Sequence, residues 1–259
     1  MVEESASGAE PGPLPSAIYH LPSGSKHHGP AERIGALLEV IICSGFPTQL
    51  LLIAVLSGFG LPVQLSGGGM NPQFVFAVSL LDAALVIGLV LLFLRAHHES
   101  ARDVLIGRVR VLREVLIGIA LIPLAFFIVL FVMALVITFA PQLHNVLSNP
   151  LENLLKTWSD TLIFAVVVMV SGGVREEVQR GFIVHRFGQY LGGGVYGVLF
   201  YSALFGLGHF EQGYDAVIAT GMLGAFWGFV YLGRGSIIAP VVSHAGFNLA
   251  QILKHVALR

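Results

Sequence analysis

Seven long apolar runs constrain what this chain can fold into. A run of roughly 20 apolar residues is long enough to cross a bilayer as a helix. Turn signals such as Asn71-Pro72, Gly192–Gly194 and Gly233–Gly235 separate several of the runs. The sequence therefore predicts an all-α, polytopic integral membrane helical bundle with about seven to eight transmembrane helices. The runs cover approximately residues 34–60, 73–95, 112–140, 153–173, 194–210, 214–232 and 236–254.

The composition agrees with a membrane protein. Hydrophobic residues make up 55% of the chain and charged residues only 11%, whereas soluble domains carry about 25% charged residues. The formal net charge of −1 gives no indication of nucleic-acid binding. The single cysteine, Cys43, excludes an internal disulfide and a CxxC metal motif. The expected partner of this surface is the lipid bilayer, with no nucleic acid.

The chain divides into a polar tail and an apolar body. Residues 1–33 are rich in Glu, Ser, Gly, Pro and His and contain few large apolar residues. Such a segment cannot bury enough apolar surface to become ordered, so a disordered N-terminal tail is predicted. Residues 34–259 form the predicted polytopic membrane domain.

The distribution of arginines predicts an orientation in the membrane. The loop 95–113 carries five arginines and should be cytoplasmic, whereas the loop 61–72 has no charges and should lie outside. The N-terminus is then inside, in a multi-pass protein of the cell membrane. With seven spans, Lys254 and Arg259 fall on the outer side, against the rule, so an eighth span or a re-entrant segment stays open.

The stretch 171–190 places ionisable residues beside an almost uncharged run. Ionisable groups at membrane depth are costly and are usually functional. On a helix, Arg180 is an i, i+4 neighbour of Glu176 and an i, i+3 neighbour of Glu177. The arginine can neutralise one carboxylate and leave the other as a general base. The alternative is the solvated, charged end of a helix at the membrane surface.

Two further motifs follow on later apolar runs. They are Phe205-Gly-Leu-Gly-His209 and His244-Ala-Gly-Phe-Asn248, and either histidine taken singly is more typical of a packing residue. A chain reversal at Gly192–Gly194 would place Glu176 and His209 both about 22–25 Å from that turn. The second turn places His244 about 12–14 Å and Asn248 about 18–20 Å away, which is a looser match in depth. The sequence predicts that these groups converge inside the membrane.

The ordered motifs resemble the CPBP family of intramembrane proteases. That family includes type II CAAX prenyl endopeptidases and bacteriocin-immunity (Abi) proteins, and the resemblance covers residues 152–255 as a catalytic core. It implies that Glu176, helped by His209, activates a water that attacks a peptide carbonyl. It also implies that His244 and Asn248 stabilise the oxyanion. The implied substrate is a membrane-associated peptide or protein, and whether it must be prenylated stays open.

The family resemblance implies a reaction without a cofactor. Two histidines and a glutamate are also enough for a zinc site with an open fourth position. Zinc held by Glu176, His209 and His244 therefore remains an alternative at this point.

The spacing of the first motif departs from the family pattern. This chain has EExxR where the family usually has EExxxR, so counting back from Arg180 or forward from Glu176 gives different assignments. Helix geometry lets either glutamate pair with Arg180. Our interpretation takes Glu176 as the base and Glu177 as the partner of Arg180.

Two other functions are compatible with the same residues. A proton-coupled membrane transporter would use a Glu/His relay, although no inverted repeat is visible. A non-catalytic scaffold or immunity protein would bind a partner through the same cavity. Among the remaining polar residues, Asp82 and Glu39 are interpreted as structural, and Trp227 and Phe226 as packing or lipid-facing residues.

Overall fold

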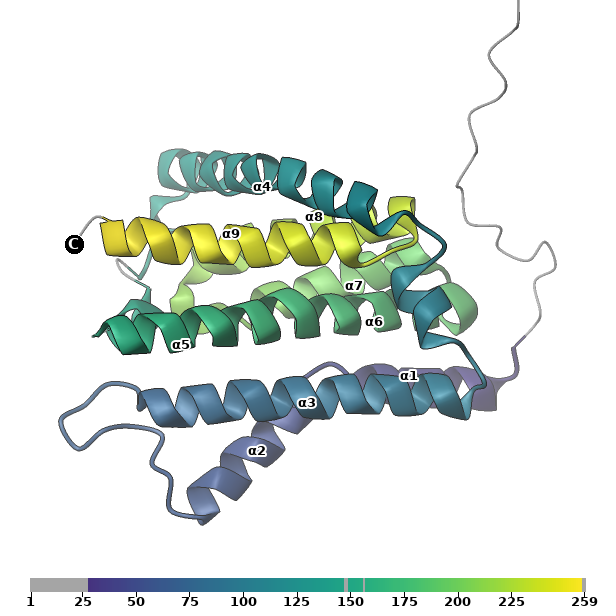
Figure 1. The fold of residues 1–259 in the computed structure, drawn as a ribbon, viewed down its shortest axis with the longest axis horizontal. Coiled ribbons are helices and arrows are strands. Elements are labelled where there is room, and N and C mark those ends of the chain that lie inside the picture. Colours follow the sequence, from purple (N-terminus) through teal and green to yellow (C-terminus); the bar gives the residue numbers. More distant parts are fainter. Residues whose placement is uncertain (1–27, 147–148, 156, 258–259) are drawn as a thin grey trace, which may run out of the picture.

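The computed structural model describes residues 28–146, 149–155 and 157–257. All regular elements among them are helices (Figure 1). The nine α-helices are α1 (Pro30–Ile42), α2 (Phe46–Gly58), α3 (Pro72–Ala96), α4 (Val111–Phe139), α5 (Trp158–Val168), α6 (Glu176–Tyr190), α7 (Gly194–Leu207), α8 (Tyr214–Arg234) and α9 (Ile238–Ala257). Two π-helices, η1 (Arg102–Ile106) and η4 (Met169–Arg175), and three 3₁₀ turns, η2 (Pro141–Leu143), η3 (Pro150–Leu154) and η5 (Phe210–Gln212), complete the order.

The helices follow the predicted apolar runs closely. The first run forms α1 and α2, which meet at a 45° bend, and Gly45 takes a positive φ of 88° at the break. Gly192 and Gly193 also have positive φ values, 100° and 127°, at the reversal from α6 to α7. Glycine adopts this conformation without the steric cost that a Cβ would add. The predicted turn between these two helices is therefore confirmed.

The all-α membrane bundle is confirmed, but fewer helices are typical spans. By length and composition, α3, α4 and α8 can cross a membrane, and the bent pair α1–α2 makes up to four. Helix α7 has only 14 residues, about 21 Å of helix against a hydrocarbon core of about 30 Å. Helix α9 carries polar residues such as His244 and Asn248. The count of seven to eight spans remains a prediction.

The predicted tail mostly lies outside the described residues, which begin at 28. Helix α1 begins at Pro30, four residues before the predicted domain boundary. Beyond the tail, every predicted run has a helical counterpart.

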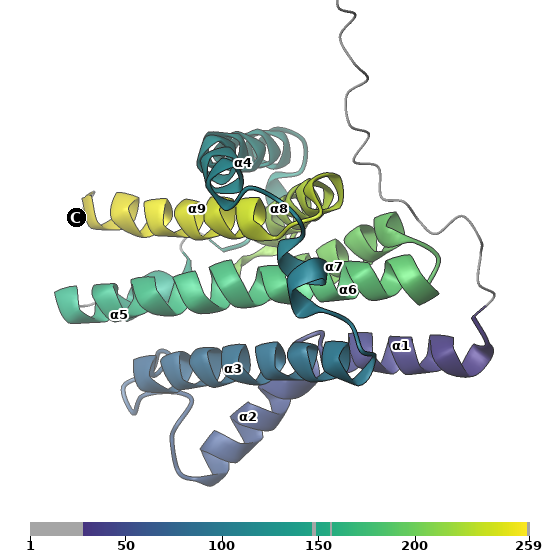
Figure 2. The same ribbon diagram turned by 45° about the vertical axis from the view of Figure 1, so that its right-hand side comes forward.

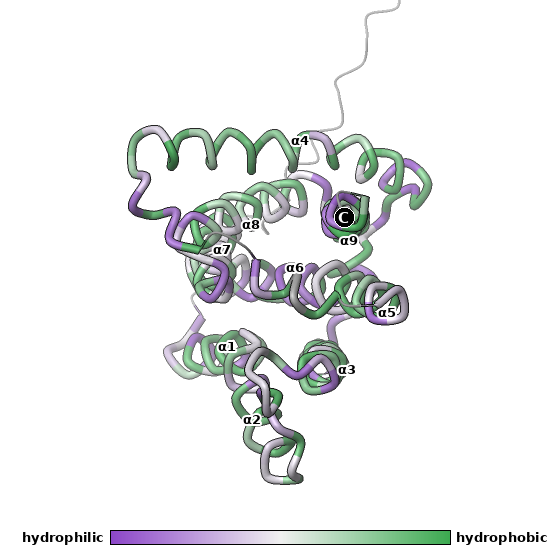
Figure 3. Tube along the Cα trace, turned by 90° about the vertical axis from the view of Figure 1, so that its left-hand side faces the viewer, coloured by the Kyte–Doolittle hydropathy of each residue, from purple (hydrophilic) through white to green (hydrophobic). Residues whose placement is uncertain are grey.

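Helix α6 is the central element of the bundle. In the end-on view it lies between α7, α8 and α9 on one side and α1 and α3 on the other, and much of it is hydrophilic (Figure 3). The turned view keeps α5 and α6 in line as one middle layer (Figure 2). A hydrophilic helix needs partners when it is surrounded, because a buried polar group without a hydrogen bond is costly.

The N-terminal helices supply those partners on one face of the middle layer. Arg175 forms a buried ion pair with Asp82 of α3, and Gln179 donates a 2.5 Å hydrogen bond to the Cys43 carbonyl. Arg186 pairs with Glu39 of α1 at 2.6 Å. Asp82 and Glu39 thus connect helices, in agreement with their interpretation as structural residues.

Candidate active site

A π-helix leads directly into the two glutamates. Helices α5, η4 and α6 run without a break, and η4 ends at Arg175, immediately before Glu176. Two glycines in η4 let α9 approach, because a Cβ on Gly173 would lie 2.7 Å from the Cβ of Ala245 and one on Gly172 would lie 2.8 Å from Asn248 Nδ2. Isolated π-turns of this kind are common at functional sites.

Glu177 is the buried, ion-paired member of the two glutamates. It forms an ion pair with Arg180, and both side chains are only 1% exposed. His244 Nδ1 lies 2.8 Å from Glu177 Oε1. Because a carboxylate accepts hydrogen bonds, Nδ1 of His244 must carry the proton in this contact. The i, i+3 spacing of Glu177 and Arg180 predicts this pairing, and the structure contains it.

Aromatic rings enclose the Arg180 guanidinium. Its central carbon lies 5.1 Å from the ring centres of Tyr201 and Phe205 and 5.7 Å from that of Trp227. Cation–π contacts at these distances stabilise a cation that has lost its hydration water. Arg180 is therefore held deep in the bundle, where Glu177 compensates its charge.

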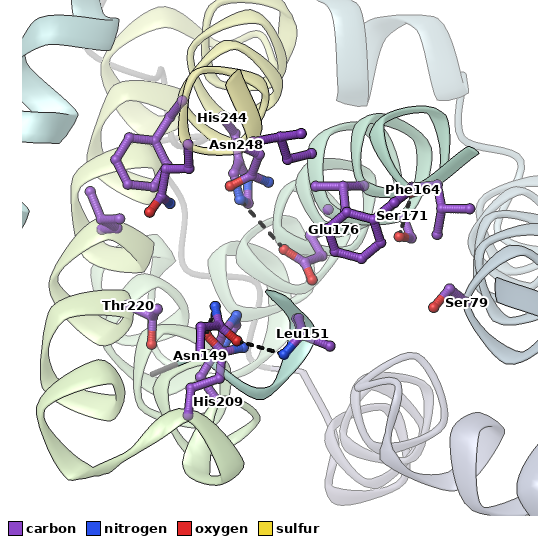
Figure 4. A pocket seen from close by; sticks show the side chains of 18 of the residues that line it. Ser79, Asn149, Leu151, Phe164, Ser171, Glu176, His209, Thr220, His244 and Asn248 are labelled. Carbon is purple, nitrogen blue, oxygen red and sulfur yellow. Dashed lines mark hydrogen bonds and ion pairs between the residues drawn. The ribbon is translucent and has the colours of Figure 1, made fainter. Parts of the chain in front are cut away.

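Glu176 faces a cavity instead. Its side chain is 19% exposed, and its Oε2 lies 3.7 Å from His244 Nε2. Figure 4 shows Glu176 and His244 directed toward one another. The same imidazole thus contacts both carboxylates, one through each ring nitrogen. Of the two glutamates, Glu176 is the one that can meet a water or a substrate.

The cavity has a volume of about 590 Å³ and a mixed lining. Apolar side chains from α5, α8 and α9 form much of its wall, including Phe164, Leu223 and Phe247. Polar groups are interspersed among them. Those from the predicted motifs are Glu176, His209, His244 and Asn248. The four predicted groups that have to meet a substrate therefore share one hollow.

His209 lies on another side of this hollow. Its Nδ1 is 2.8 Å from the carbonyl oxygen of Phe205, which only accepts hydrogen bonds, so Nδ1 is the donor. The neutral ring then has an unprotonated Nε2. Figure 4 places His209 beside Asn149 and Thr220, separated from Glu176 and His244. The structure brings His209 into the same cavity without direct contact to either glutamate.

Trp227 is a part of the site that the sequence did not reveal. It is fully buried, lines the cavity, and stacks on the ring of His244 with centroids 3.8 Å apart. The interpretation of Trp227 as a packing residue describes its burial, but it misses this support of a site histidine. Trp227 belongs to an apolar run, and no local motif links it to His244.

Arg175 was also missed as a site-supporting residue. Counting back from Arg180, the usual EExxxR spacing would put a glutamate at this position, where the chain has arginine, so the sequence motif gives Arg175 no role of its own. In the structure it is buried and holds the last turn of η4 to Asp82. The partners are 93 residues apart in sequence, so no local pattern predicts the pair.

The arrangement of donors does not form a three-ligand metal site. Among the described residues, no group of three or more His, Cys, Asp and Glu side chains is placed to hold a metal ion. His209 stands apart from Glu176 and His244 (Figure 4), and Nδ1 of His244 already contacts Glu177. Glu176, His209 and His244, the zinc ligands considered from sequence, are therefore not gathered around one point in this geometry.

Residues 157–250 match the family model of type II CAAX prenyl endopeptidase Rce1-like proteins. This part of the chain is similar to the Rce1-like family. The Rce1-like segment runs from the start of α5 to the last turns of α9, and it contains all six residues of the predicted site. Helices α1 to α4 lie outside it. No curated protein and no solved structure matches the chain.

The match confirms the predicted relationship to CAAX-type intramembrane proteases. Rce1-like proteins are a family of membrane proteases. The family match does not assign roles to the individual residues of the cavity.

Proposed function

We propose that the protein is an intramembrane endopeptidase that hydrolyses a peptide bond near or within the membrane, with Glu176 as the general base. The observation that carries the proposal is the difference in burial and pairing between the two glutamates. Glu177 is 1% exposed and paired with Arg180, whereas Glu176 is 19% exposed and lines the cavity. Of these two glutamates, Glu176 is the one whose carboxylate a water molecule can reach.

Glu177 and Arg180 are positioning residues in this proposal. Arg180 keeps Glu177 ionised, and Glu177 accepts the hydrogen bond from His244 Nδ1. This contact orients the imidazole so that Nε2 points toward Glu176. A second carboxylate that orients a histidine in this way fixes its tautomer as well as its direction.

His244 and Asn248 supply donors to the developing oxyanion. Because Nδ1 of His244 donates to Glu177, Nε2 can donate only when the ring is an imidazolium. In that form the ring and Arg180 would together balance the two carboxylates, and a site without net charge is less costly where solvation is poor. Asn248 offers its Nδ2 from the next turn of α9. Removing one such donor costs about 3 kcal/mol of transition-state stabilisation.

The reaction needs only water as co-reactant. Glu176 takes a proton as the water oxygen bonds to the carbonyl carbon, and the carbonyl electron pair moves to oxygen. The tetrahedral intermediate then expels the amine, which receives the proton from Glu176. His209 lies on another side of the cavity, where its unprotonated Nε2 can accept a hydrogen bond from a second water or from the substrate backbone. No cofactor takes part in these steps.

The proposed substrate is a membrane-associated peptide or protein. Rce1-like family members act on membrane-associated, prenylated proteins, and the apolar wall of the cavity suits a chain that arrives from the lipid. Neither the geometry nor the charge of the lining makes a prenyl group a requirement, so prenylated and unprenylated peptides are compared in the test.

Hydrolysis of a membrane-presented peptide by the purified protein tests the proposal. Cleavage is expected with and without a strong chelator, and alanine at Glu176, Glu177, His209, His244 or Asn248 should abolish it. Cleavage that disappears with the chelator and returns with zinc would contradict the metal-free mechanism. Proton-coupled uptake without cleavage would indicate a transporter, and full biological activity of all five variants would indicate a scaffold.

A further inference from the structure

Five exposed arginines lie on the connection between α3 and α4 and on the helix ends beside it. They are Arg95, Arg102, Arg108, Arg110 and Arg113. None of them forms an ion pair with the part of the chain that the structure describes. The four arginines of η4, α6 and α8, by contrast, each pair with a carboxylate. This end of the molecule therefore presents positive charge that the chain itself does not neutralise, and such charge attracts anions.

The acidic residues of the same connection leave that charge in place. Glu99 pairs with His185 and Arg186 of α6. Asp103 is exposed and forms no ion pair within the described ranges. The connection therefore keeps an excess of positive charge.

Apolar side chains are exposed directly beside these arginines. Leu91 and Leu92 are exposed near the end of α3, and Val111 and Leu112 are exposed at the start of α4. In a membrane bundle, such apolar helix surface faces the acyl chains of the lipid. Arginines near the ends of these helices extend toward the interface with water. The unpaired guanidinium groups therefore lie at the level of the lipid headgroups.

A pocket of about 470 Å³ lies where the chain leaves α3. It is lined by Leu91, Leu94, Arg95, His98, Glu99 and Ala101. The lining combines apolar side chains with a guanidinium and an imidazole, and its one carboxylate is already paired with α6. A free anion gains nothing from the apolar part, and a hydrocarbon chain gains nothing from the cationic part. A phospholipid carries a phosphate and acyl chains, which suit both parts.

His98 lines this pocket in a backbone conformation that favours glycine. Its φ is 58°, and among the described residues it is the one non-glycine residue with a positive φ. The turn ends α3 through hydrogen bonds from the His98 N–H to the Arg95 carbonyl at 3.0 Å and from the Glu99 N–H to the Leu94 carbonyl at 2.8 Å. Helices that end in this way usually have glycine at the left-handed position. A histidine kept there against the backbone preference points to a use for its imidazole.

We propose that this pocket binds the headgroup of an anionic phospholipid. Arg95 and a ring N–H of His98 donate hydrogen bonds to the phosphate oxygens, and an acyl chain lies along the exposed Leu91. The other arginines of the connection favour a net negative headgroup over a zwitterionic one, because they repel a second, cationic group. The inference goes beyond the proposed hydrolysis and does not depend on it.

Native mass spectrometry of the purified full chain in detergent tests the proposal. The protein is titrated with phosphatidylglycerol or with phosphatidylcholine that carries the same acyl chains. The first molecule of phosphatidylglycerol should bind about five-fold more tightly, and Arg95→Gln or His98→Gly should each remove about that factor. Arg33→Gln, a matched change at an exposed arginine of α1 outside the pocket, should bind like the wild type. Equal binding of the two lipids by the wild type, or full selectivity in both pocket variants, would overturn the proposal.

Two controls identify the ligand and separate binding from folding. An excess of inorganic phosphate should leave phosphatidylglycerol bound, whereas displacement by phosphate would indicate a site for a free anion and contradict a lipid site. His98→Gly should keep or raise the melting temperature, because a φ of 58° suits glycine, so that its lost selectivity reflects the missing imidazole. If His98→Gly melts at a lower temperature, Arg95→Gln alone decides, and unchanged selectivity in that variant overturns the proposal.

Discussion

Trp227 stacks nearly parallel to His244, with ring centroids 3.8 Å apart and an angle of 18° between the planes. Its Nε1 donates a 3.1 Å hydrogen bond to the hydroxyl of Ser243, the residue before His244. The indole is fully buried and cannot rotate freely. This contact therefore fixes the plane of the imidazole that lies between Glu176 and Glu177.

Replacing Trp227 should damage the reaction more than substrate binding. Trp227→Leu removes the flat support, and misplacement of the imidazole should lower kcat about 10- to 100-fold. Trp227→Phe keeps an aromatic face and should recover part of the loss. The measurement is kcat and KM for a membrane-presented peptide. A rise in KM with unchanged kcat would show that Trp227 contacts substrate and does not position His244.

Removing the charge of Glu177 should destabilise the fold. Glu177→Gln leaves the guanidinium of Arg180 buried without a counter-charge, and breaking a buried ion pair in this way costs about 3–5 kcal/mol. The double variant Glu177→Gln/Arg180→Met removes both charges and should regain much of that stability. Unfolding in detergent by denaturant measures the difference. Equal stability of the two variants would contradict a buried, mutually dependent pair.

Gly173 should tolerate a methyl group only if α9 gives way. A Cβ at Gly173 would lie 2.7 Å from the Cβ of Ala245, and overpacking of this kind costs about 1–3 kcal/mol. Gly173→Ala should also lower activity, because α9 carries His244 and Asn248. The matched rescue is Gly173→Ala/Ala245→Gly, which restores the space. Cleavage rate and melting temperature are measured for the single and double variants, and failure of the rescue would argue against helix separation as the cause.

Stability should fall in acid through Glu99, which lies in the connection after α3. Burial raises the pKa of its carboxyl group, but hydrogen bonds from His185, Arg186 and Gln189 outweigh burial and lower the pKa from 4.5 to about 2. The unfolded chain therefore binds the proton more readily than the folded one. The stabilising contribution is complete above pH 4.5 and is lost as the pH falls toward 2.

The melting temperature in detergent between pH 6 and pH 3 checks this contribution. Glu99→Gln should melt at a lower temperature at pH 6 and should show a flatter decline toward pH 3 than the wild type. An unchanged slope would mean that other carboxyl groups govern the acid sensitivity.

The sequence predicted the elements and the meeting point of the motifs. Glu176, His209, His244 and Asn248 do line one cavity, because each motif lies on its own apolar helix and glycine turns set the reversals. The ion pair of Glu177 and Arg180 follows from spacing within a single helix. These features are local or depend on the rise of a helix, so they can be predicted from the sequence.

Other features depend on contacts between distant segments. The pairing of Arg175 with Asp82 and the stacking of Trp227 on His244 join separate helices, and neither has a spacing that marks it. The position of His209 away from the glutamates also escaped the depth argument. That argument fixes the level along the helix but not the direction in which a side chain points.

The central claim is that Glu176 is the general base, and single-turnover cleavage by Glu176→Gln tests it most directly. The substitution preserves shape, and loss of a general base lowers the rate about 10²- to 10⁴-fold. The account predicts that loss with an unchanged melting temperature and unchanged peptide binding, while the exposed control Glu211→Gln cleaves like the wild type. Cleavage by Glu176→Gln within a few-fold of the wild-type rate would contradict it.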